Sequence, residues 1–442
     1  MDFDADAIVI GAGAAGLAAA RYLAERSLRV VVLEARNRIG GRVTAHATTR
    51  ALVPAELGAE FIHGPAHETM ALLREAGTAT VDTGTGDSWI RAANGDLQRD
   101  DVDFSGAAGI FEGVRALGHD ESVDDFLHRF DGDPKMRETV KRARAFAEGF
   151  DAADPAIASA LALADEIASG VDSTSARALG GYGPLFEQLR AACIAAGVVV
   201  RLSMAVRRIA WRRGAVDVDV HRGAETLTFR ARAAIVTLPV GVLRHRGDET
   251  SVLFEPALPS VNQAALHKLE MGQVVKVMLW FRYAFWQELH GARYHDAAFF
   301  RNEVGAFAAY WTQYPVRSEL IAAWAGGPKA IALRGKSHDQ LIALALDGLG
   351  AVFGEPALVR AELEGAAVHD WDHDPFSRGA YSYVRVDGGN ARAALATPVD
   401  ETLFFAGEAT SNDGQGGTVN GALETGERAA REAAAALGGP DG

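Results

Sequence analysis

The sequence predicts a mixed α/β fold, α+β overall, and three patterns support this prediction. Short apolar runs at 8–10 and 30–33 flank a stretch, 17–23, whose apolar residues recur with helical spacing, so the chain opens as strand, helix and strand. Alternating strand patterns follow in the middle of the chain. The C-terminal part returns to one strand and a long alanine-rich helix. Since 442 residues exceed one simple core, we expect more than one domain.

The other elements are expected in chain order from the same patterns. An amphipathic helix covers 66–77, and the pattern from about 104 to 168 is helical, with breaks at Pro134 and Pro155. A glycine-rich turn opens a helix within 177–197. Strands then follow at 198–202, 215–222, 225–231 and 233–243, strands and helices alternate from about 261 to 370, and the strand 402–407, the loop 413–418 and the helix 419–437 close the chain.

Composition narrows the class of protein. Hydrophobic residues make up 48% and charged residues 23%, with no apolar run of about 18 or more residues, so we expect a soluble protein without a membrane partner. The first residues carry no basic segment and no signal-type apolar region, which predicts a cytoplasmic location. The net charge of −14 disfavours nucleic acid as a partner and favours the approach of cationic small molecules.

Cys193 is the only cysteine, which excludes an internal disulfide and any multi-cysteine metal site. Its surroundings, AACIAAG, are typical of the buried face of a helix, so we expect a core role for this thiol. No other pattern has the spacing of metal ligands, and no metal site is predicted. The oligomeric state stays open.

A nucleotide site is predicted at the first turn. Gly11, Gly13 and Gly16 form a G-x-G-x-x-G pattern between a strand and a helix, where glycine permits a tight turn, close approach of the backbone to a pyrophosphate and close helix packing. Glu34 ends the next strand, where its carboxylate can accept hydrogen bonds from an adenosine ribose. A 2′-phosphate would be repelled there, so we expect a Rossmann-like domain that binds NAD or FAD and not NADP.

The residues after Glu34 favour FAD over NAD. Gly40 and Gly41 lie between Arg36 and Arg42, and bare backbone with cationic side chains could hold a diphosphate from its other side, as an extended FAD requires.

The stretch QVVKVMLWF, 273–281, carries a lysine within an apolar strand. Val274, Lys276, Met278 and Trp280 share one face, and apolar residues also line the other face, so the strand is expected to be covered on both sides. One interpretation is a buried stem whose ammonium group reaches water. The other is a functional lysine. The second is favoured because the chain has six lysines against 38 arginines, so a lysine here indicates a need for a compact, titratable head.

These segments resemble the flavin-containing amine oxidases, the group of monoamine oxidases, polyamine oxidases and lysine-specific histone demethylases. The resemblance begins with VIGAGAAGLAAARYL and VVVLEARNRIGGRV, and further similar segments recur in the same order along the chain: ELGAEFIHGP, ALGGYGPLFEQL, AAIVTLPVGVL, VVKVMLWF, WDHDPFSRGAYSYV and LFFAGEATSNDGQGGTVNGALETGERAA. It therefore covers both ends of the chain.

The resemblance implies an FAD-binding domain built from 1–72, 196–262 and 372–442, and a substrate-binding domain of mixed sheet and helices built from 73–195 and 263–371. Gly11, Gly13 and Gly16 would hold the pyrophosphate, Glu34 the adenosine ribose, and the backbone of Val206 the adenine. Around the diphosphate and ribitol it implies Arg36, Gly41, Arg42, Gly407 and Glu408, and it implies that a helix beginning at Thr418 and Val419 points at the flavin, where a helix N-terminus stabilises the reduced anion.

For the substrate side, the resemblance implies that Trp371 packs beside the flavin ring and that Tyr381 forms an aromatic wall. Ala380 occupies the place of the cysteine that binds flavin in covalent monoamine oxidases, so noncovalent FAD is expected. Thr418 replaces a second tyrosine, which points away from a strict monoamine oxidase. His63 resembles the histidine that faces the substrate in animal polyamine oxidases.

Lys276 matches the lysine that reaches flavin N5 through a water. It could position the water that hydrolyses an imine or, as a cation, assist electron transfer to dioxygen, and the sequence leaves both roles open. The expected activity is FAD-dependent oxidation of an amine C–N bond with O₂ as the acceptor. A polyamine or secondary amine is favoured. Primary monoamines, an L-amino acid and a non-catalytic flavin-binding role are the alternatives.

Overall fold

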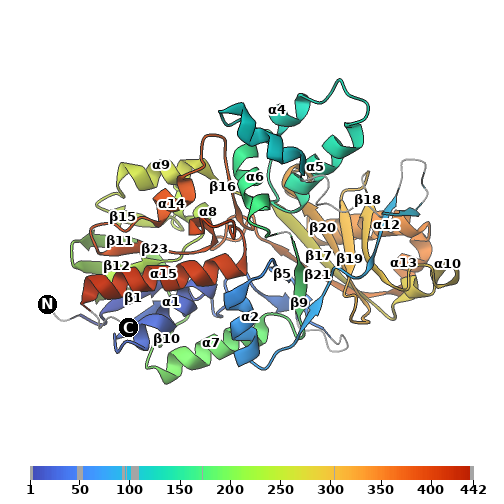
Figure 1. The fold of residues 1–442 in the computed structure, drawn as a ribbon. Helices are drawn as coiled ribbons and strands as arrows, with labels where there is room; N and C mark the ends of the chain where they lie inside the picture. The colour runs from blue at the N-terminus through green and yellow to red at the C-terminus, as the bar shows by residue number, and fades with distance from the viewer. Residues whose placement is uncertain are drawn as a thin grey trace.

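The computed structural model describes residues 3–46, 53–91, 95, 97–100, 109–171, 173–302 and 304–438. It confirms the mixed α/β prediction, with a parallel sheet in one half of the molecule and a large mixed sheet in the other (Figure 1). Part of the expected helical segment that starts near residue 104 lies outside the described residues.

The first half is built on a five-stranded parallel sheet. Its strand order is β10 (Val199–Arg201), β2 (Val30–Leu33), β1 (Ala7–Ile10), β14 (Ala233–Val236) and β23 (Leu403–Phe405). All residues of β1, β2, β14 and β23 are buried, as expected for strands covered on both faces. Segments from both ends of the chain and from its middle therefore form one sheet.

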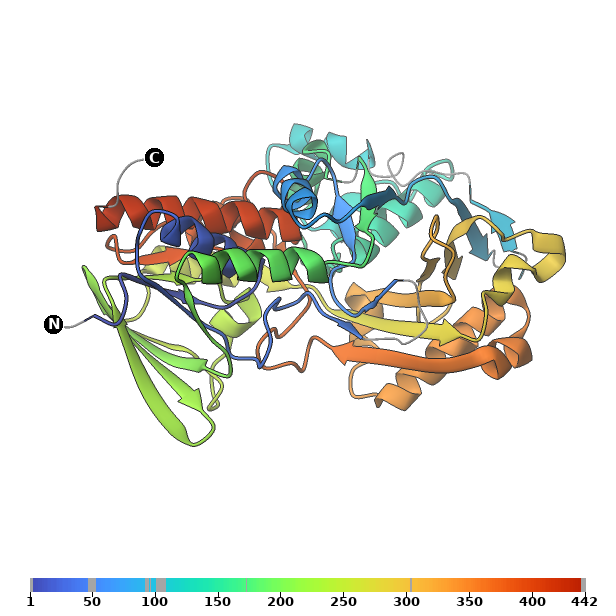
Figure 2. The same cartoon turned by 90° about the horizontal axis from the view of Figure 1, so that it is seen from below.

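Three helices cover one face of this sheet: α1 (Ala14–Ala24), α7 (Gly183–Ala195) and α15 (Val419–Leu437). Figures 1 and 2 show α15, in red, lying along α1, in blue. The contact is close because a Cβ atom on Gly426 of α15 would lie 2.3 Å from the Ala15 carbonyl oxygen. Cys193 lies in this core, fully buried, with Sγ 3.4 Å from the Leu17 carbonyl oxygen, which confirms its core role.

The other face of the parallel sheet packs on a four-stranded sheet and on nearby short elements. The four strands are ordered β13 (Glu225–Ala231), β12 (Ala215–Arg222), β11 (Ala205–Arg212) and β15 (Leu253–Glu255). The short elements are α8 (Val240–Arg244), α9 (Ser260–Lys268), β16 (Leu269–Met271), β22 (Ser382–Val384), α14 (Ala391–Ala396) and the 3₁₀ turn Glu408–Thr410.

The second half is built on a seven-stranded mixed sheet. Its order is β21 (Leu363–Asp370), β17 (Val274–Phe281), β20 (Leu320–Gly326), β19 (Ala309–Thr312), β18 (Ala297–Asn302), β7 (Asp87–Arg91) and β8 (Leu97–Arg99). Helices cover one face: α10 (Leu289–Ala292), α11 (Gly327–Ile331), α12 (His338–Phe353), α13 (Pro356–Glu362) and the 3₁₀ turn Phe285–Gln287. Val277, Leu279 and Phe281 of β17 pack on that side, whereas Met278 and Trp280 face the opposite side, which confirms the expected alternation.

Smaller elements connect the two halves. One small sheet is ordered β5 (Phe61–His63), β9 (Ser175–Ala178) and β6 (Thr80–Asp82), and another pairs β3 (Ala45–His46) with β4 (Ala55–Glu56). The helix α2 (His67–Glu75) packs on α7 and α15. A helical layer contains the 3₁₀ helix Gly109–Leu117, α4 (Val123–His128), α5 (Arg137–Gly149) and α6 (Ala160–Ala168).

Two of the domain boundaries expected from the sequence do not follow the packing. The helix α7 falls within 73–195, which we expected in the substrate-binding domain, yet Leu185, Phe186 and Leu189 pack in the core beneath α1. The segment 263–371 was also expected in the substrate-binding domain, but Ala265 and Leu266 of α9 pack in the core of the parallel-sheet half. Both elements bury their apolar faces against the sheet nearest to them in space.

Candidate active site

A cavity of about 1400 Å³ extends from the parallel sheet to the large mixed sheet. It brings together all but one of the residues expected to bind cofactor or substrate: Gly11, Gly13, Glu34, Arg36, Gly41, Arg42, His63, Val206, Lys276, Trp371, Tyr381, Gly407, Glu408, Thr418 and Val419. Gly16 does not line the cavity.

The glycine turn has the geometry of a phosphate cradle. Gly11 has a φ of +109°, a conformation that favours glycine, and Gly13 is the N-cap of α1. A Cβ atom on Gly13 would meet nothing within 4 Å, so this backbone is open to the cavity. A Cβ atom on Gly16 would lie 1.9 Å from the Gly11 carbonyl oxygen. Gly16 therefore serves close packing of the turn, and its expected contact with the pyrophosphate stays a prediction.

Glu34 lies at the end of β2 with its carboxylate fixed by the backbone. Its Oε2 accepts from Ala12 N at 2.8 Å and its Oε1 from Arg36 N at 2.8 Å. Burial raises the pKa of Glu34 despite these hydrogen bonds. Each oxygen retains a second lone pair for a ribose hydroxyl. Val206 of β11 lines the same cavity, and its contact with adenine stays a prediction.

Arg36 lines the cavity, but its guanidinium group already has a carboxylate partner. Nη1 and Nη2 donate to the two oxygens of Asp374 at 2.7 and 2.9 Å, and Nη2 also donates to Ser377 Oγ. Arg38 holds the second glycine loop instead, since it donates to the carbonyl oxygens of Gly41 and Val43. The expected contact of Arg36 with a diphosphate stays a prediction.

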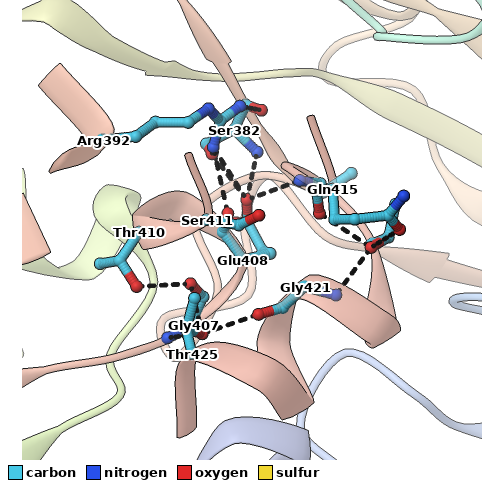
Figure 3. Close-up of polar contacts among 12 residues, drawn as sticks. Ser382, Arg392, Gly407, Glu408, Thr410, Ser411, Gln415, Gly421 and Thr425 are labelled. Atoms are coloured by element: carbon cyan, nitrogen blue, oxygen red, sulfur yellow. Dashed lines mark hydrogen bonds and ion pairs between the residues drawn. The ribbon is translucent and has the colours of Figure 1, made fainter. Parts of the chain in front are cut away.

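Glu408 is the centre of a buried polar network next to the cavity (Figure 3). Arg42 Nη1 donates to its Oε1 at 2.8 Å, and its Oε2 accepts from Ser382 Oγ at 2.6 Å and Gly417 N at 3.2 Å. Arg392 donates to Ser382 Oγ and to the Glu408 carbonyl oxygen. Burial alone would raise the pKa of Glu408, but the charges of Arg42 and Arg392 lower it, so the carboxylate is charged.

The helix α15 begins at the cavity wall as expected from the sequence. Thr418 is its N-cap, and Thr418 Oγ1 accepts from Gly421 N at 2.9 Å. Thr418 and Val419 both line the cavity, so the N-terminal end of a 19-residue helix borders this space. Such an end favours negative charge close to it.

Lys276 is 1% exposed, so the interpretation in which its ammonium group reaches water is wrong. Nζ lies 2.7 Å from Glu60 Oε2 and donates to the Gly58 carbonyl oxygen at 3.3 Å. Glu60 also forms an ion pair with Arg177, whose Nε lies 2.8 Å from Oε1. Burial alone would raise the pKa of Glu60, but Lys276 and Arg177 hold it at about 2.

Aromatic side chains surround the middle of the cavity. Trp371 Nε1 donates to the Leu57 carbonyl oxygen at 2.9 Å, and Tyr381 Oη donates to the Phe150 carbonyl oxygen at 2.6 Å. The His63 ring makes an edge contact with Phe150 at 5.0 Å between centroids. Burial lowers the pKa of His63 to about 4, so this imidazole is neutral at neutral pH.

Two carboxyl groups, Asp151 and Glu166, line the cavity near Tyr381 and hydrogen-bond to each other. Burial and the charge of Asp151 raise the pKa of Glu166 well above its usual value, and these effects outweigh the attraction of Arg392. A carboxylate and a carboxylic acid that share one proton carry one negative charge. The pair can therefore receive a cationic group of a ligand.

Comparison with known proteins identifies the family. The family described as flavin containing amine oxidoreductase matches residues 14–434. The chain belongs to this flavin-containing amine oxidoreductase family. Its relatives include polyamine oxidase 3 of Oryza sativa subsp. japonica, which is 30% identical over 471 residues, with 96% of this chain and 88% of the relative covered.

Other relatives in this amine oxidoreductase family are larger. Lysine-specific histone demethylase 1 homolog 2 of Oryza sativa subsp. japonica is 29% identical over 456 residues, and the match covers 96% of this chain but 56% of the relative. Among solved structures, a wild-type putrescine oxidase bound to putrescine has a TM-score of 0.79 at 22% identity, covering 98% of this chain and 99% of the other. Cyclohexylamine oxidase from Brevibacterium oxydans IH-35A has a TM-score of 0.77 at 23% identity, with 98% of both chains covered. The two structures share the fold.

The cavity fits FAD, the cofactor expected for this family. It is lined by the open backbone of Gly13, the carboxylate of Glu34 and the N-terminus of α15, and its volume exceeds what a small ligand alone would need. When bound, FAD would supply the acceptor for a hydride. No helix in the described residues is long and apolar enough to cross a membrane.

Four charged groups of this site were not found from the sequence: Glu60, Asp151, Glu166 and Arg392. Glu60 had a usable signal, because an acidic residue within the apolar stretch GAEFIHG is unusual and predicts a partner. Arg392 had a similar signal in the alanine-rich ARAALA. Asp151 follows the polar and aromatic stretch AEGF and Glu166 follows Asp165 in ALALADEIA, and neither pattern indicates that the two side chains meet.

Proposed function

We propose that this chain is an FAD-dependent amine oxidase whose substrate is a diamine or polyamine. FAD, held by the glycine turn, Glu34 and the N-terminus of α15, would supply the acceptor for a hydride from the α-carbon of a neutral amine, and O₂ would take up the two electrons and two protons as hydrogen peroxide. Water would then hydrolyse the imine to an aldehyde or ketone and ammonia or an amine. The residues of the chain bind and orient the amine, exclude bulk water and keep the reacting nitrogen unprotonated.

The observation that carries the choice of substrate is the Asp151–Glu166 pair. Its shared negative charge lines the same cavity as Lys276, Trp371 and Tyr381. A diamine has one nitrogen to be oxidised and a second that stays protonated, and a buried carboxyl pair is a suitable partner for that second ammonium group. A monoamine has nothing to place there.

His63 and the aromatic residues fit the other requirements of this reaction. A neutral imidazole can accept a hydrogen bond from an amine N–H, and the low pKa of His63, about 4, keeps this acceptor available at neutral pH. Trp371 and Tyr381 offer ring surfaces to the alkyl chain. FAD would not be linked covalently to a cysteine, because Cys193 lies buried in the helix core and does not line the cavity. This proposal agrees with the presence of polyamine oxidases from Oryza sativa subsp. japonica and Arabidopsis thaliana among the relatives of the chain.

The test compares two amines that differ only in the second nitrogen. Purified protein should be yellow, and under anaerobic conditions 1,4-diaminobutane should bleach the flavin, whereas butylamine should do so far more slowly at the same concentration. Spermidine, spermine, tyramine and benzylamine extend the panel. Equal rates with both members of the pair would favour a monoamine oxidase, and no bleaching by any amine would contradict oxidase function altogether.

A further inference from the structure

Glu60 lies between two buried cations in the wall of the cavity. Its side chain connects Lys276 of β17 with Arg177 of β9, and the three residues are 7%, 1% and 6% exposed. The two carboxylate oxygens are divided between the cations, since Oε2 lies 2.7 Å from Lys276 Nζ and Oε1 lies 2.8 Å from Arg177 Nε. Glu60 precedes the strand β5, whose partner β9 carries Arg177.

Neutral donors complete the surroundings of this carboxylate. Trp311 Nε1 lies 3.1 Å from both Glu60 oxygens, and Gln313 Nε2 donates to Oε1 at 3.2 Å. Two hydrogen bonds fix the position of Lys276 Nζ, which donates to Glu60 Oε2 and to the Gly58 carbonyl oxygen. A buried ammonium group that is held by a carboxylate and a carbonyl oxygen has a fixed position, and removing one partner of such a pair leaves the other charge uncompensated.

We propose that Glu60 is a positioning residue that keeps Lys276 as a fixed ammonium group in the cavity wall, so that Lys276 acts as a positive charge and hydrogen-bond donor and not as a base. The inference rests on the proposed function because it requires FAD, and the resemblance to the family implies that Lys276 lies beside the flavin. An amine in this apolar strand without a counter-charge would give up its proton easily, whereas the adjacent carboxylate opposes that loss. A fixed cation stabilises negative charge that develops near it during reaction.

The other charged groups around Lys276 define the controls. Arg177 approaches from β9, and Glu56 of β4 is close enough to interact with both Lys276 and Glu60. Burial raises the pKa of Glu56 to about 7. His369 is the register partner of Lys276 on β21, but its imidazole is held by Asp374 at 2.8 Å. The variant Glu56→Gln therefore removes a second carboxyl group that interacts with Lys276 and is expected to titrate near neutral pH.

The experiment measures the resting flavin of the holoenzyme, without any amine. Sulfite adds to flavin N5, and its dissociation constant, read from the loss of visible absorbance, reports positive charge near that atom. We expect Glu60→Gln to weaken sulfite binding by about 10-fold relative to the parent at pH 9 but much less at pH 6, because a buried ammonium group without its counter-charge is lost more easily as the pH rises. Glu60→Asp should restore most of the affinity, and Glu56→Gln should keep the parent's behaviour at pH 9.

The variant Lys276→Met decides whether the effect of Glu60 acts through the lysine. In that background Glu60→Gln should change sulfite binding no further. The proposal is overturned if Glu60→Gln follows the parent at every pH, or if its effect persists in Lys276→Met. If Glu60→Gln alone does not retain FAD, recovery of FAD in the double variant supports the coupling, and failure of both overturns it. Because no amine is used, inactivity of the parent toward every amine would contradict the proposed function and leave this comparison readable.

Discussion

Two sets of buried acids at the cavity treat charge in opposite ways. In the set assigned to the flavin end under the proposed function, carboxylates face cations: Glu408 binds Arg42, Asp374 binds Arg36, and Glu60 binds Lys276. In the set assigned to the substrate end, which is close enough to Arg392 and Glu408 to interact with both, Glu166 is hydrogen-bonded to a second acid, Asp151. Matched pairs keep one charge state over a wide pH range, whereas a pair of acids changes its protonation when a cation arrives. The first arrangement suits a permanent cofactor and the second a cationic ligand that comes and goes.

The glycine turn offers the strongest perturbation of the flavin end. Gly16→Ala should prevent folding, because its Cβ atom would lie 1.9 Å from the Gly11 carbonyl oxygen. Gly13→Ala is the matched control, since a Cβ atom there meets no protein atom within 4 Å. We expect Gly13→Ala to fold with normal circular dichroism but to bind FAD at least about 10-fold more weakly, because the methyl group occupies the approach to the pyrophosphate. If Gly13→Ala bound FAD with unchanged affinity, the prediction that the pyrophosphate lies at this turn would be wrong.

The second effect concerns the fixed cation at the flavin end. Lys276→Met should retain FAD but slow flavin reduction, reoxidation or both, by on the order of 100-fold, as expected for loss of a preorganised charge. Stopped-flow absorbance measures both half-reactions. Lys268→Met is the control, because Lys268 Nζ donates to the Val386 carbonyl oxygen and does not line the cavity. Unchanged rates in both half-reactions of Lys276→Met would show that the matched pair has no catalytic role.

At the substrate end, Asp151→Asn removes the charge of the acid pair. The KM for 1,4-diaminobutane should rise about 10- to 100-fold, the effect of losing a charge-assisted hydrogen bond, while steady-state constants for butylamine change little. In the parent, diamine affinity should also increase as the pH rises and Glu166 loses its proton, and Glu166→Gln should abolish that increase. Equal losses for diamine and monoamine would show that the pair supports structure and does not select a cation.

The buried His63 is expected to make the stability of the folded chain depend on pH. Its pKa is about 4 in the folded chain and near 6.5 when unfolded, so the unfolded state binds more protons between these values. Stability should therefore fall as the pH is lowered from 6.5 to 4, by up to about 1.4 kcal/mol per pH unit from this group. Denaturant unfolding of His63→Asn should show a shallower dependence. The exposed His267 provides the control, since His267→Asn should keep the parent's slope.

The smallest effect is expected at the buried carboxyl group of Glu56. Its Oε2 has no hydrogen-bond partner, and burial raises its pKa to about 7. A raised carboxyl pKa means that stability is lost as the pH rises from about 4.5 through 7. Glu56→Gln should then be more stable than the parent at pH 8, by about 2 kcal/mol, and similar at pH 5. The exposed Glu187→Gln should differ from the parent at neither pH.

How much could be predicted from the sequence also differs between the two ends. The flavin end depends on residues that are neighbours in the chain, such as the glycines of GAGAAG and the carboxylate that ends β2, so spacing alone locates them. The helix expected at 419–437 agrees with α15, because its cap and its alanine-rich face are local. Lys276 could be singled out from the alternation of its own strand.

The charge pairs could not be predicted, because each joins segments far apart in the sequence. Glu60 and Lys276 are separated by 216 positions, and neither segment contains information about the other. The packing of α7 and α9, next to the expected domain boundaries at 195 and 262, could not be predicted for a related reason: both helices have ordinary amphipathic patterns, and only the neighbouring sheets decide where their apolar faces are buried.

The contact between α1 and α15 has a consequence for the synthesis of this chain on the ribosome. The glycine turn that precedes α1 is made long before the edge strand β23 and the helix that packs on Ala15 through Gly426. A nascent chain that ends before residue 403 lacks one strand of the parallel sheet and the helix N-terminus at Thr418. FAD capture is therefore expected only after translation of these residues, and the exposed β14 edge would need protection until then.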